Sequence, residues 1–268
     1  MSSALGSLSA LGRSEADWSG GSGIYNAQFF TDPSLPRHTI YAPKVPVKGK
    51  KLPLIVWGNG ACGTDGSGFS NFLTEIASHG FMVIANGAPK KKWETRAVQL
   101  TEAIDWAEKG AAGEKYGEVD MTRVAAAGQS CGGVEAYSAS VYESRVKVIG
   151  IYNTGVIDPG RRWMLKDIKQ PIGYFYGGTA DFSQEYIEQD YKDIRPDLPA
   201  MMSVANSGGH FGTYFEKQGG AYGRISVAWW KWQLLGDEAS KAMFLDTSSA
   251  LYTRDGWKIN TSHWKDIK

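Results

Sequence analysis

A short apolar run, Arg123–Ala127, leads directly into Gly128-Gln129-Ser130-Cys131-Gly132, and residues of helical character follow it. The pattern predicts a strand that stops in a sharp turn and feeds a helix. Such a turn puts the serine in strained backbone geometry, and its flanking glycines prevent clashes with neighbouring segments. The helix N-terminus beside the serine favours negative charge there. The pentapeptide alone is a weak signal, because 33 of the 268 residues are glycine. The strand before it and the helix after it give it weight.

Strand-like runs alternate with helical patterns along the chain. The strand-like runs are His38–Ala42, Leu52–Trp57, Phe81–Ala85, Arg123–Ala127, Val146–Tyr152, Ile172–Tyr176 and Ala200–Ala205. The helical patterns are Phe69–Ser78, Thr95–Glu108, Gly133–Tyr142, Gln184–Asp193, Tyr222–Leu235 and Glu238–Phe244. This alternation is typical of an α/β fold, with a mostly parallel sheet covered by helices on both faces.

One domain, residues 25–268, is expected after a Ser/Gly-rich N-terminal arm, residues 1–24. A chain of this length can bury one large core, and α/β folds of this size commonly form a single domain. The connection from Gly155 to Pro171 is too short to hold a separate cap domain. We therefore expect an open groove without a lid.

The charges are balanced, with 29 Lys and Arg against 28 Asp and Glu, so nothing favours a nucleic acid or an acidic membrane surface as partner. No apolar run approaches the roughly 20 residues that span a bilayer. No metal, other cofactor or obligate protein partner is implied. The chain start lacks the pattern of a secretion signal. Localisation is left open, with a secreted mature protein slightly favoured over a cytoplasmic one.

A serine hydroxyl becomes a good nucleophile only beside a base, which a third group must orient. Of the four histidines, His210 lies in a Gly-rich loop directly after the last apolar strand. Ligand sites of parallel sheets gather at the carboxyl ends of the strands. We therefore expect His210 to reach Ser130, the alternative being a surface histidine of that loop.

The orienting acid is expected between Ser130 and His210 in the chain, in the order serine, acid, histidine. Asp181 follows the strand Ile172–Tyr176 and is the first candidate. Asp158, after the preceding strand, is the alternative. Asp181 could also serve only to cap the helix that begins near Ser183.

A tetrahedral oxyanion needs two backbone donors, the N–H after the nucleophile and one from a loop after an early strand. The first is Cys131, and the second is Ala61, in the glycine-dense loop after Leu52–Trp57. These glycines could also simply permit a tight turn. If both N–H groups point at one oxygen, a disulfide between Cys62 and Cys131 becomes geometrically feasible. Two buried thiols are equally compatible with the sequence.

A substrate groove is expected to involve Asn59, Trp93 and Trp163. The two tryptophans lie in loops after strands, where aromatic rings can wall a groove for an apolar acyl group. Surface packing explains these rings equally well. The run Trp229-Trp230-Lys231-Trp232 lies on an expected helix and is interpreted as packing.

The elbow, Asp181, His210 and the glycine loop together resemble the α/β-hydrolase superfamily over nearly the whole chain. The absence of a cap, the run Gly209–Tyr214 and the run Ala77–Ile84 are similar to the dienelactone hydrolase-like, cutinase-like and polyester hydrolase-like group. The resemblance implies a serine esterase that forms an acyl-enzyme on a small-molecule or polymeric ester. Two departures are Ser130, where dienelactone hydrolases use cysteine, and Asn59-Gly60, where the usual loop reads His-Gly.

Other functions are compatible with the same residues. An acyltransferase, an amidase or a peptidase would use the same three side chains. A non-catalytic binding protein on this scaffold is a further alternative, although such a protein has no reason to keep all three.

Overall fold

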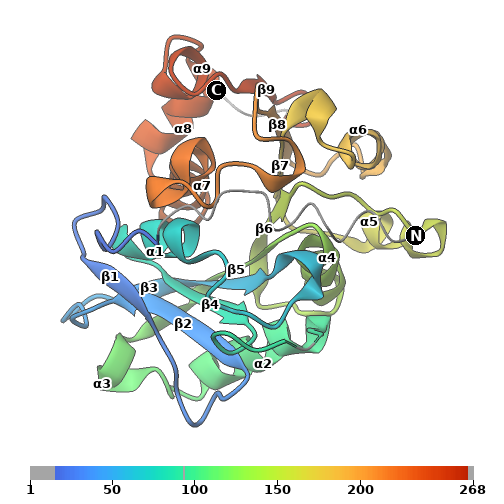
Figure 1. The fold of residues 1–268 in the computed structure, drawn as a ribbon. Coiled ribbons are helices and arrows are strands. Elements are labelled where there is room, and N and C mark those ends of the chain that lie inside the picture. The colour runs from blue at the N-terminus through green and yellow to red at the C-terminus, as the bar shows by residue number, and fades with distance from the viewer. Residues whose placement is uncertain (1–15, 93, 265–268) are drawn as a thin grey trace.

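A computed structural model describes residues 16–92 and 94–264, and a nine-stranded sheet in the order β1-β2-β4-β3-β5-β6-β7-β8-β9 forms its centre (Figure 1). The strands are β1 (Ala27–Phe30), β2 (His38–Pro43), β3 (Leu52–Gly58), β4 (Met82–Asn86), β5 (Val119–Gln129), β6 (Val146–Tyr152), β7 (Ile172–Tyr176), β8 (Ala200–Val204) and β9 (Lys258–Asn260).

Strands β3 to β8 run parallel to one another. The outer strands differ, because β2 pairs antiparallel with both β1 and β4, and β9 pairs antiparallel with β8. This mixed, mostly parallel sheet confirms the predicted α/β fold, and its topology is consistent with that of α/β-hydrolases.

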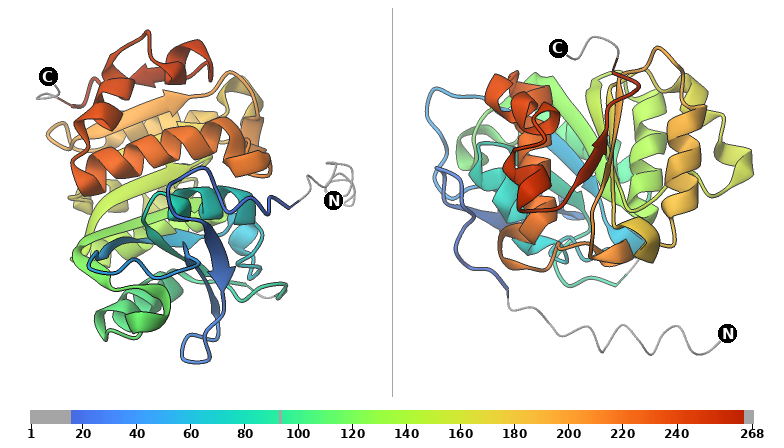
Figure 2. Two further views of the ribbon diagram at one scale, coloured as in Figure 1. Left: turned by 90° about the vertical axis from the view of Figure 1, so that its left-hand side faces the viewer. Right: turned by 90° about the horizontal axis from the view of Figure 1, so that it is seen from above.

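Helices cover both faces of the sheet (Figure 2). One face packs against α1 (Ser70–Ser78), α7 (Gly220–Leu235), α8 (Glu238–Leu245) and α9 (Ala250–Thr253). The other packs against α2 (Ala97–Glu108), α3 (Gly113–Tyr116), α4 (Cys131–Tyr142), α5 (Met164–Asp167) and α6 (Gln184–Asp193). Short 3-10 turns are η1 (Gly60–Cys62), η2 (Pro159–Arg161), η3 (Gly178–Ala180), η4 (Gly209–Phe211) and η5 (Lys217–Gly219).

Strand β3 shows why the central strands read as continuous apolar runs. Leu54 and Val56 point into the core under α2 and α4, whereas Ile55 and Trp57 point into the core under α1 and α7. Successive side chains of a strand alternate between faces, so a strand covered on both sides needs apolar residues throughout.

The edges of the sheet differ from the sequence-based expectation. Strands β1 and β9 were not predicted, since each is short and lacks a continuous apolar run. Strand β5 begins at Val119 instead of Arg123, and α4 begins at Cys131 instead of Gly133. Residues 119–123 are partly exposed, so they carry no apolar signature of a buried strand.

The connection between β6 and β7, all of it described, holds only the short turns η2 and α5, so no domain is inserted there. Residues 16–24 of the predicted arm lie against α1. The N–H of Asp17 donates to Asn71 Oδ1 at 2.8 Å, and that of Ser22 donates to Glu75 Oε2 at 2.7 Å. The remainder of the arm, residues 1–15, lies outside the described residues. Within the described ranges, no helix is both long enough and apolar enough to cross a membrane.

Candidate active site

The carboxyl ends of neighbouring parallel strands bring the predicted residues to one edge of the sheet. Ser130 follows β5, Asp181 follows β7 through the turn η3, and His210 lies in η4 after β8. The loop with Ala61 follows β3, which is the neighbour of β5. Because parallel strands end at the same edge of a sheet, the loops that follow them meet there, although they are far apart in sequence.

Ser130 lies on a strained strand-to-helix turn, with φ 54° and ψ −122°. Its own N–H still donates to Tyr152 O at 2.9 Å, so the sheet ladder continues up to Ser130 itself. A Cβ on Gly128 would lie 2.2 Å from the Gly132 carbonyl oxygen, and a Cβ on Gly132 would lie 2.1 Å from the Gly58 carbonyl oxygen. Gly128 is therefore required by the close approach of β5 to α4, and Gly132 by that of β3 to α4.

Two hydrogen bonds link the serine, the histidine and the acid. Ser130 Oγ lies 2.9 Å from His210 Nε2, and His210 Nδ1 lies 2.9 Å from Asp181 Oδ1. An ionised carboxylate can only accept, so Nδ1 donates to Asp181. In the neutral imidazole, Nε2 is then left as the acceptor for the serine hydroxyl. The imidazole is therefore oriented as a base toward Ser130.

Asp181 is 2 % exposed and carries several hydrogen bonds. Burial raises the pKa of this carboxyl, but hydrogen bonds from His210, Ser183 and Asn153 outweigh it and lower the pKa to about 2. The Ser183 hydroxyl donates at 2.6 Å and Asn153 Nδ2 at 2.7 Å. Asp181 is thus a carboxylate at neutral pH.

The alternative acid, Asp158, lies elsewhere. Its side chain is 61 % exposed, accepts the N–H of Gly160 at 2.9 Å and pairs with Arg161 at 3.4 Å. It caps the turn η2, whereas Asp181 is the carboxylate that contacts His210.

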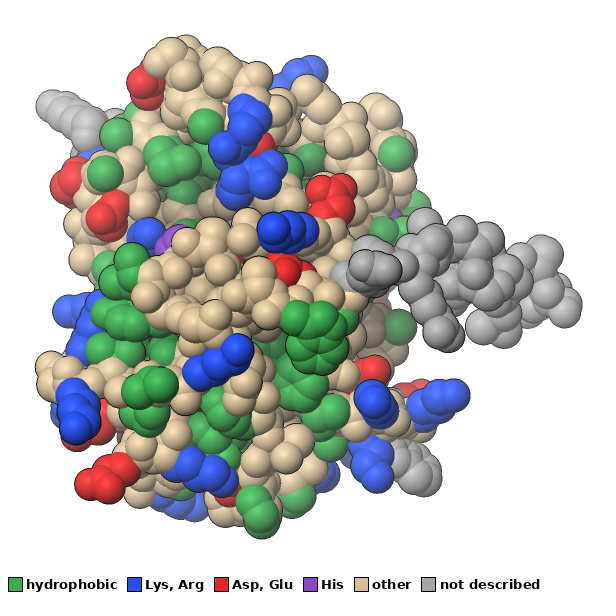
Figure 3. All heavy atoms as spheres, turned by 60° about the vertical axis from the view of Figure 1, so that its left-hand side comes forward, with side chains coloured by type: hydrophobic (Ala, Val, Ile, Leu, Met, Phe, Trp, Pro, Cys, Tyr) green, Lys and Arg blue, Asp and Glu red, His purple; other side chains and the backbone are tan. Residues whose placement is uncertain are grey.

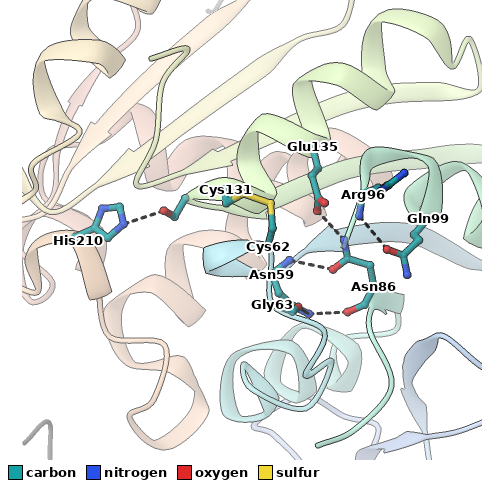
Figure 4. The surroundings of a disulfide bond; sticks show 10 residues. Asn59, Cys62, Gly63, Asn86, Arg96, Gln99, Cys131, Glu135 and His210 are labelled. Carbon is teal, nitrogen blue, oxygen red and sulfur yellow. Dashed lines mark hydrogen bonds between the residues drawn. A yellow bond between two sulfur atoms is a disulfide. The ribbon is translucent and has the colours of Figure 1, made fainter. Parts of the chain in front are cut away.

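The loop after β3 is joined covalently to the elbow. Ala61 and Cys62 adopt left-handed conformations, with φ 56° and 47°. Cys62 forms a disulfide with Cys131, and the two Cα atoms are 5.1 Å apart (Figure 4). Of the two alternatives that the sequence left open, the disulfide is the one present, and it ties the residue after Ala61 to the first residue of α4.

Asn59 and Trp163, two of the three predicted groove residues, do not line a common groove. Asn59 is buried and its Nδ2 donates to Gly63 O at 3.1 Å, so the side chain spans the loop from within. Trp163 packs on Tyr142 at the far end of α4, with ring centroids 6.2 Å apart. At 1.5 Å per residue, this end is about 16 Å from Cys131. Trp93 lies outside the described residues.

An aromatic ring that the sequence did not single out lies directly on the candidate base. Phe182 stacks on His210 with ring centroids 3.8 Å apart and an interplanar angle of 29°, and it is 69 % exposed. Phe211 meets the same imidazole nearly edge-on, with centroids 5.7 Å apart. Both phenylalanines are exposed to solvent, so apolar surface borders the imidazole.

Two buried polar residues at this edge were also missed from the sequence. Gln129, inside the elbow, donates from Nε2 to the His210 carbonyl oxygen at 2.9 Å. A Cβ on Gly60 would lie 2.0 Å from Gln129 Oε1, so the same side chain packs against the loop after β3. Asn153, after β6, has φ 48° and contacts Asp181. Gln129 is part of the elbow pentapeptide, but the motif itself assigns no contact to its side chain, and Asn153 belongs to no motif.

The described residues bring together no group of three His, Cys, Asp or Glu side chains that could hold a metal ion. On the face in Figure 3, positive and negative side chains are interspersed, in keeping with the net charge of +1.

No family model and no curated protein matches the chain. The fold and the geometry of the site are therefore the grounds for a functional proposal.

Proposed function

We propose that this protein is a serine hydrolase that cleaves carboxylic esters through an acyl-enzyme. The observation that carries the proposal is the pair of 2.9 Å hydrogen bonds that join Ser130 to His210 and His210 to Asp181. The strained backbone of Ser130 and the topology of the sheet add support, because a nucleophile held on such an elbow is typical of serine hydrolases.

In this mechanism, Ser130 Oγ attacks the acyl carbon while its proton passes to His210 Nε2. Asp181 stabilises the imidazolium that forms. The tetrahedral intermediate then collapses, the bond to the alcohol oxygen breaks, and the imidazolium returns the proton to that oxygen. Water next attacks the acyl carbon and gives a proton to His210. The acid leaves as Ser130 Oγ is protonated again.

The oxyanion of each tetrahedral intermediate would accept hydrogen bonds from the N–H groups of Cys131 and Ala61. One such donor is worth on the order of 3 kcal/mol of transition-state stabilisation in serine hydrolases. The N-terminus of α4 adds a favourable dipole at the same point. The disulfide between Cys62 and Cys131 supports the assignment, since it holds the two donor segments together.

Hydrolysis is favoured over acyl transfer because no inserted domain between β6 and β7 shields the serine from water. The disulfide also favours an oxidising compartment as the site of action, since such bonds are rare in a reducing cytosol. We therefore propose a secreted ester hydrolase, acting on a small-molecule or polymeric ester.

Fluorophosphonate labelling tests the proposal. The wild-type protein should be labelled on one residue, and Ser130→Ala should abolish the labelling. A panel of p-nitrophenyl esters of increasing acyl length then measures turnover and chain-length preference. Labelling without hydrolysis of any ester would favour transferase or peptidase chemistry, and a protein that is never labelled would overturn the proposal.

A further inference from the structure

A buried acid on α4 lies one helical turn beyond the disulfide. Glu135 follows Cys131 by four residues, so the two side chains share a face of the helix. The Glu135 side chain is buried, and its Oε2 accepts a hydrogen bond from Asn86 Nδ2 at 2.7 Å (Figure 4). The proposed reaction has no direct use for this acid.

Asn86, the last residue of β4, contacts both Glu135 and the loop after β3. Its Oδ1 accepts the backbone N–H of Asn59 at 3.1 Å, and its carbonyl oxygen accepts from Asn59 Nδ2 at 2.5 Å. A backbone N–H can only donate, so the amide oxygen of Asn86 must face Asn59. Its NH₂ group must then face Glu135. An acceptor at position 135 therefore fixes the orientation of this amide.

Asn59 in turn closes the loop that carries the proposed oxyanion donor. Its Nδ2 also donates to Gly63 O at 3.1 Å, so its side chain bridges the two ends of the turn η1. Within that turn, Ala61 and Cys62 have positive φ, which costs a non-glycine residue on the order of 1 kcal/mol or more. Surrounding contacts must hold a turn of this kind in place.

The groups that face Glu135 are neutral. Burial raises the pKa of Glu135 above its ordinary value, and hydrogen bonds from Asn86 and Thr95 oppose the rise only in part. The contact thus needs an acceptor oxygen at this position, which a glutamine also supplies.

We propose that Glu135 is a positioning residue of the oxyanion turn, which orients Asn86 and thereby fixes the backbone that presents the Ala61 N–H. This inference rests on the proposed ester hydrolysis for its catalytic consequence. The orientation of the turn by Glu135 does not depend on that reaction.

Three variants separate this role from general stability. Glu135→Gln keeps an acceptor oxygen, whereas Glu135→Leu removes it. Glu143→Leu is the matched control, because Glu143 is the C-cap of the same helix, is equally buried and bonds to Arg145 at 2.8 Å. We expect Glu135→Leu to lower kcat for a p-nitrophenyl ester by about 10- to 100-fold with KM within about threefold, because a misplaced oxyanion donor affects the transition state alone. Glu135→Gln and Glu143→Leu should stay within about twofold of wild type.

A boronic acid inhibitor gives a second readout, because its tetrahedral adduct with serine places a negatively charged oxygen where the oxyanion forms. Its affinity should fall in Glu135→Leu by a factor similar to that of kcat, and stay unchanged in Glu143→Leu. If Glu135→Leu fails to fold, Glu135→Asp replaces it, because the shorter side chain withdraws the acceptor from Asn86.

Amide NMR shifts of Ala61 and Cys62 decide the structural part without reference to activity. These resonances should move in Glu135→Leu and stay in place in Glu135→Gln and Glu143→Leu. Unmoved resonances in Glu135→Leu would overturn the positioning role, even in an active esterase. If the wild type is never labelled by a fluorophosphonate, ester hydrolysis fails, and shifted resonances would still support control of the turn by Glu135.

Discussion

Asn153 donates a hydrogen bond from its Nδ2 to Asp181 Oδ2 at 2.7 Å, from a backbone position with φ 48°. The same amide nitrogen lies 3.0 Å from Gly209 O and 3.1 Å from the Tyr222 hydroxyl, and its Oδ1 accepts from the Tyr214 hydroxyl. One fully buried side chain at the end of β6 thus joins the candidate acid, the histidine loop and α7.

Replacement of Asn153 should therefore lower activity as well as stability. Asn153→Gly keeps the positive φ accessible but loses the hydrogen bonds, and we expect kcat to fall about 10-fold as Asp181 loses a partner. Asn153→Ala should lose the same activity and a further roughly 1 kcal/mol of stability, because alanine disfavours this backbone conformation. Ester turnover and urea unfolding measure the two effects. A glycine variant with wild-type kcat would contradict the role in orientation.

The choice between the two candidate acids can be tested directly. Asp181→Asn should lower kcat by on the order of 10⁴-fold, because the amide no longer holds the imidazole in the tautomer that accepts the serine proton. Asp158→Asn changes an exposed cap of η2 and should leave kcat unchanged. Steady-state kinetics of the two variants decide between them, and the reverse pattern would reassign the acid.

Asp181 should also contribute to acid unfolding. Its pKa is about 2 in the folded protein, below the ordinary 3.8. A depressed pKa stabilises the folded state above the unfolded value, and this contribution is lost as pH falls through the folded one. The gap corresponds to about 2 kcal/mol, lost between roughly pH 4 and 2. Urea unfolding across that range should show a smaller decline in Asp181→Asn than in wild type, and equal declines would argue against the depressed pKa.

The predicted residues that meet at the candidate site share one property, which is that a local pattern marks each of them. Ser130 lies between required glycines, and His210 and Asp181 each lie in the loop that follows an apolar strand. Parallel strands end at a common edge, so a position in the chain translates into a position in space. The same rule makes a disulfide between Cys62 and Cys131 feasible, because both cysteines lie in segments that follow neighbouring strands, but it does not distinguish the bond from two free thiols.

The supporting residues have no such mark. Glu135 reads as an ordinary helix residue, and Asn153 and Gln129 read as polar residues at strand ends. What they contact depends on how α4, β4 and β6 pack, which periodicity does not specify. The aromatic residues show the same limit. Trp163 packs on the far end of α4, whereas Phe182, which no pattern distinguishes, lies on His210.

Phe182 should affect substrate preference more than stability. It is 69 % exposed, so Phe182→Ala should change the free energy of unfolding by less than about 0.5 kcal/mol. Its ring covers one face of His210, which is the base in the proposed mechanism. We expect kcat/KM to fall about 3- to 10-fold for long-chain or aromatic esters and less for acetate esters. Equal losses across a p-nitrophenyl ester series would instead indicate a role in orienting His210.

The disulfide should serve both stability and catalysis. It closes a loop with a sequence separation of 69, for which chain entropy gives about 4 kcal/mol of stabilisation. A Cys62→Ala, Cys131→Ala double variant avoids an unpaired thiol and keeps the N–H group of residue 131. Its midpoint of urea unfolding should decrease.

The catalytic effect of this variant is measured where the protein remains fully folded. We expect kcat to fall about 10-fold with little change in KM. The turn with Ala61 is no longer fixed to α4, so the hydrogen bond from Ala61 to the oxyanion weakens, whereas binding of the ester in the ground state is unaffected. Treatment of the wild type with a thiol reductant should reproduce the loss, and the double variant should not respond to the reductant. Unchanged kcat in the folded double variant would show that the hydrogen bonds of Asn59 and Asn86 alone hold the turn.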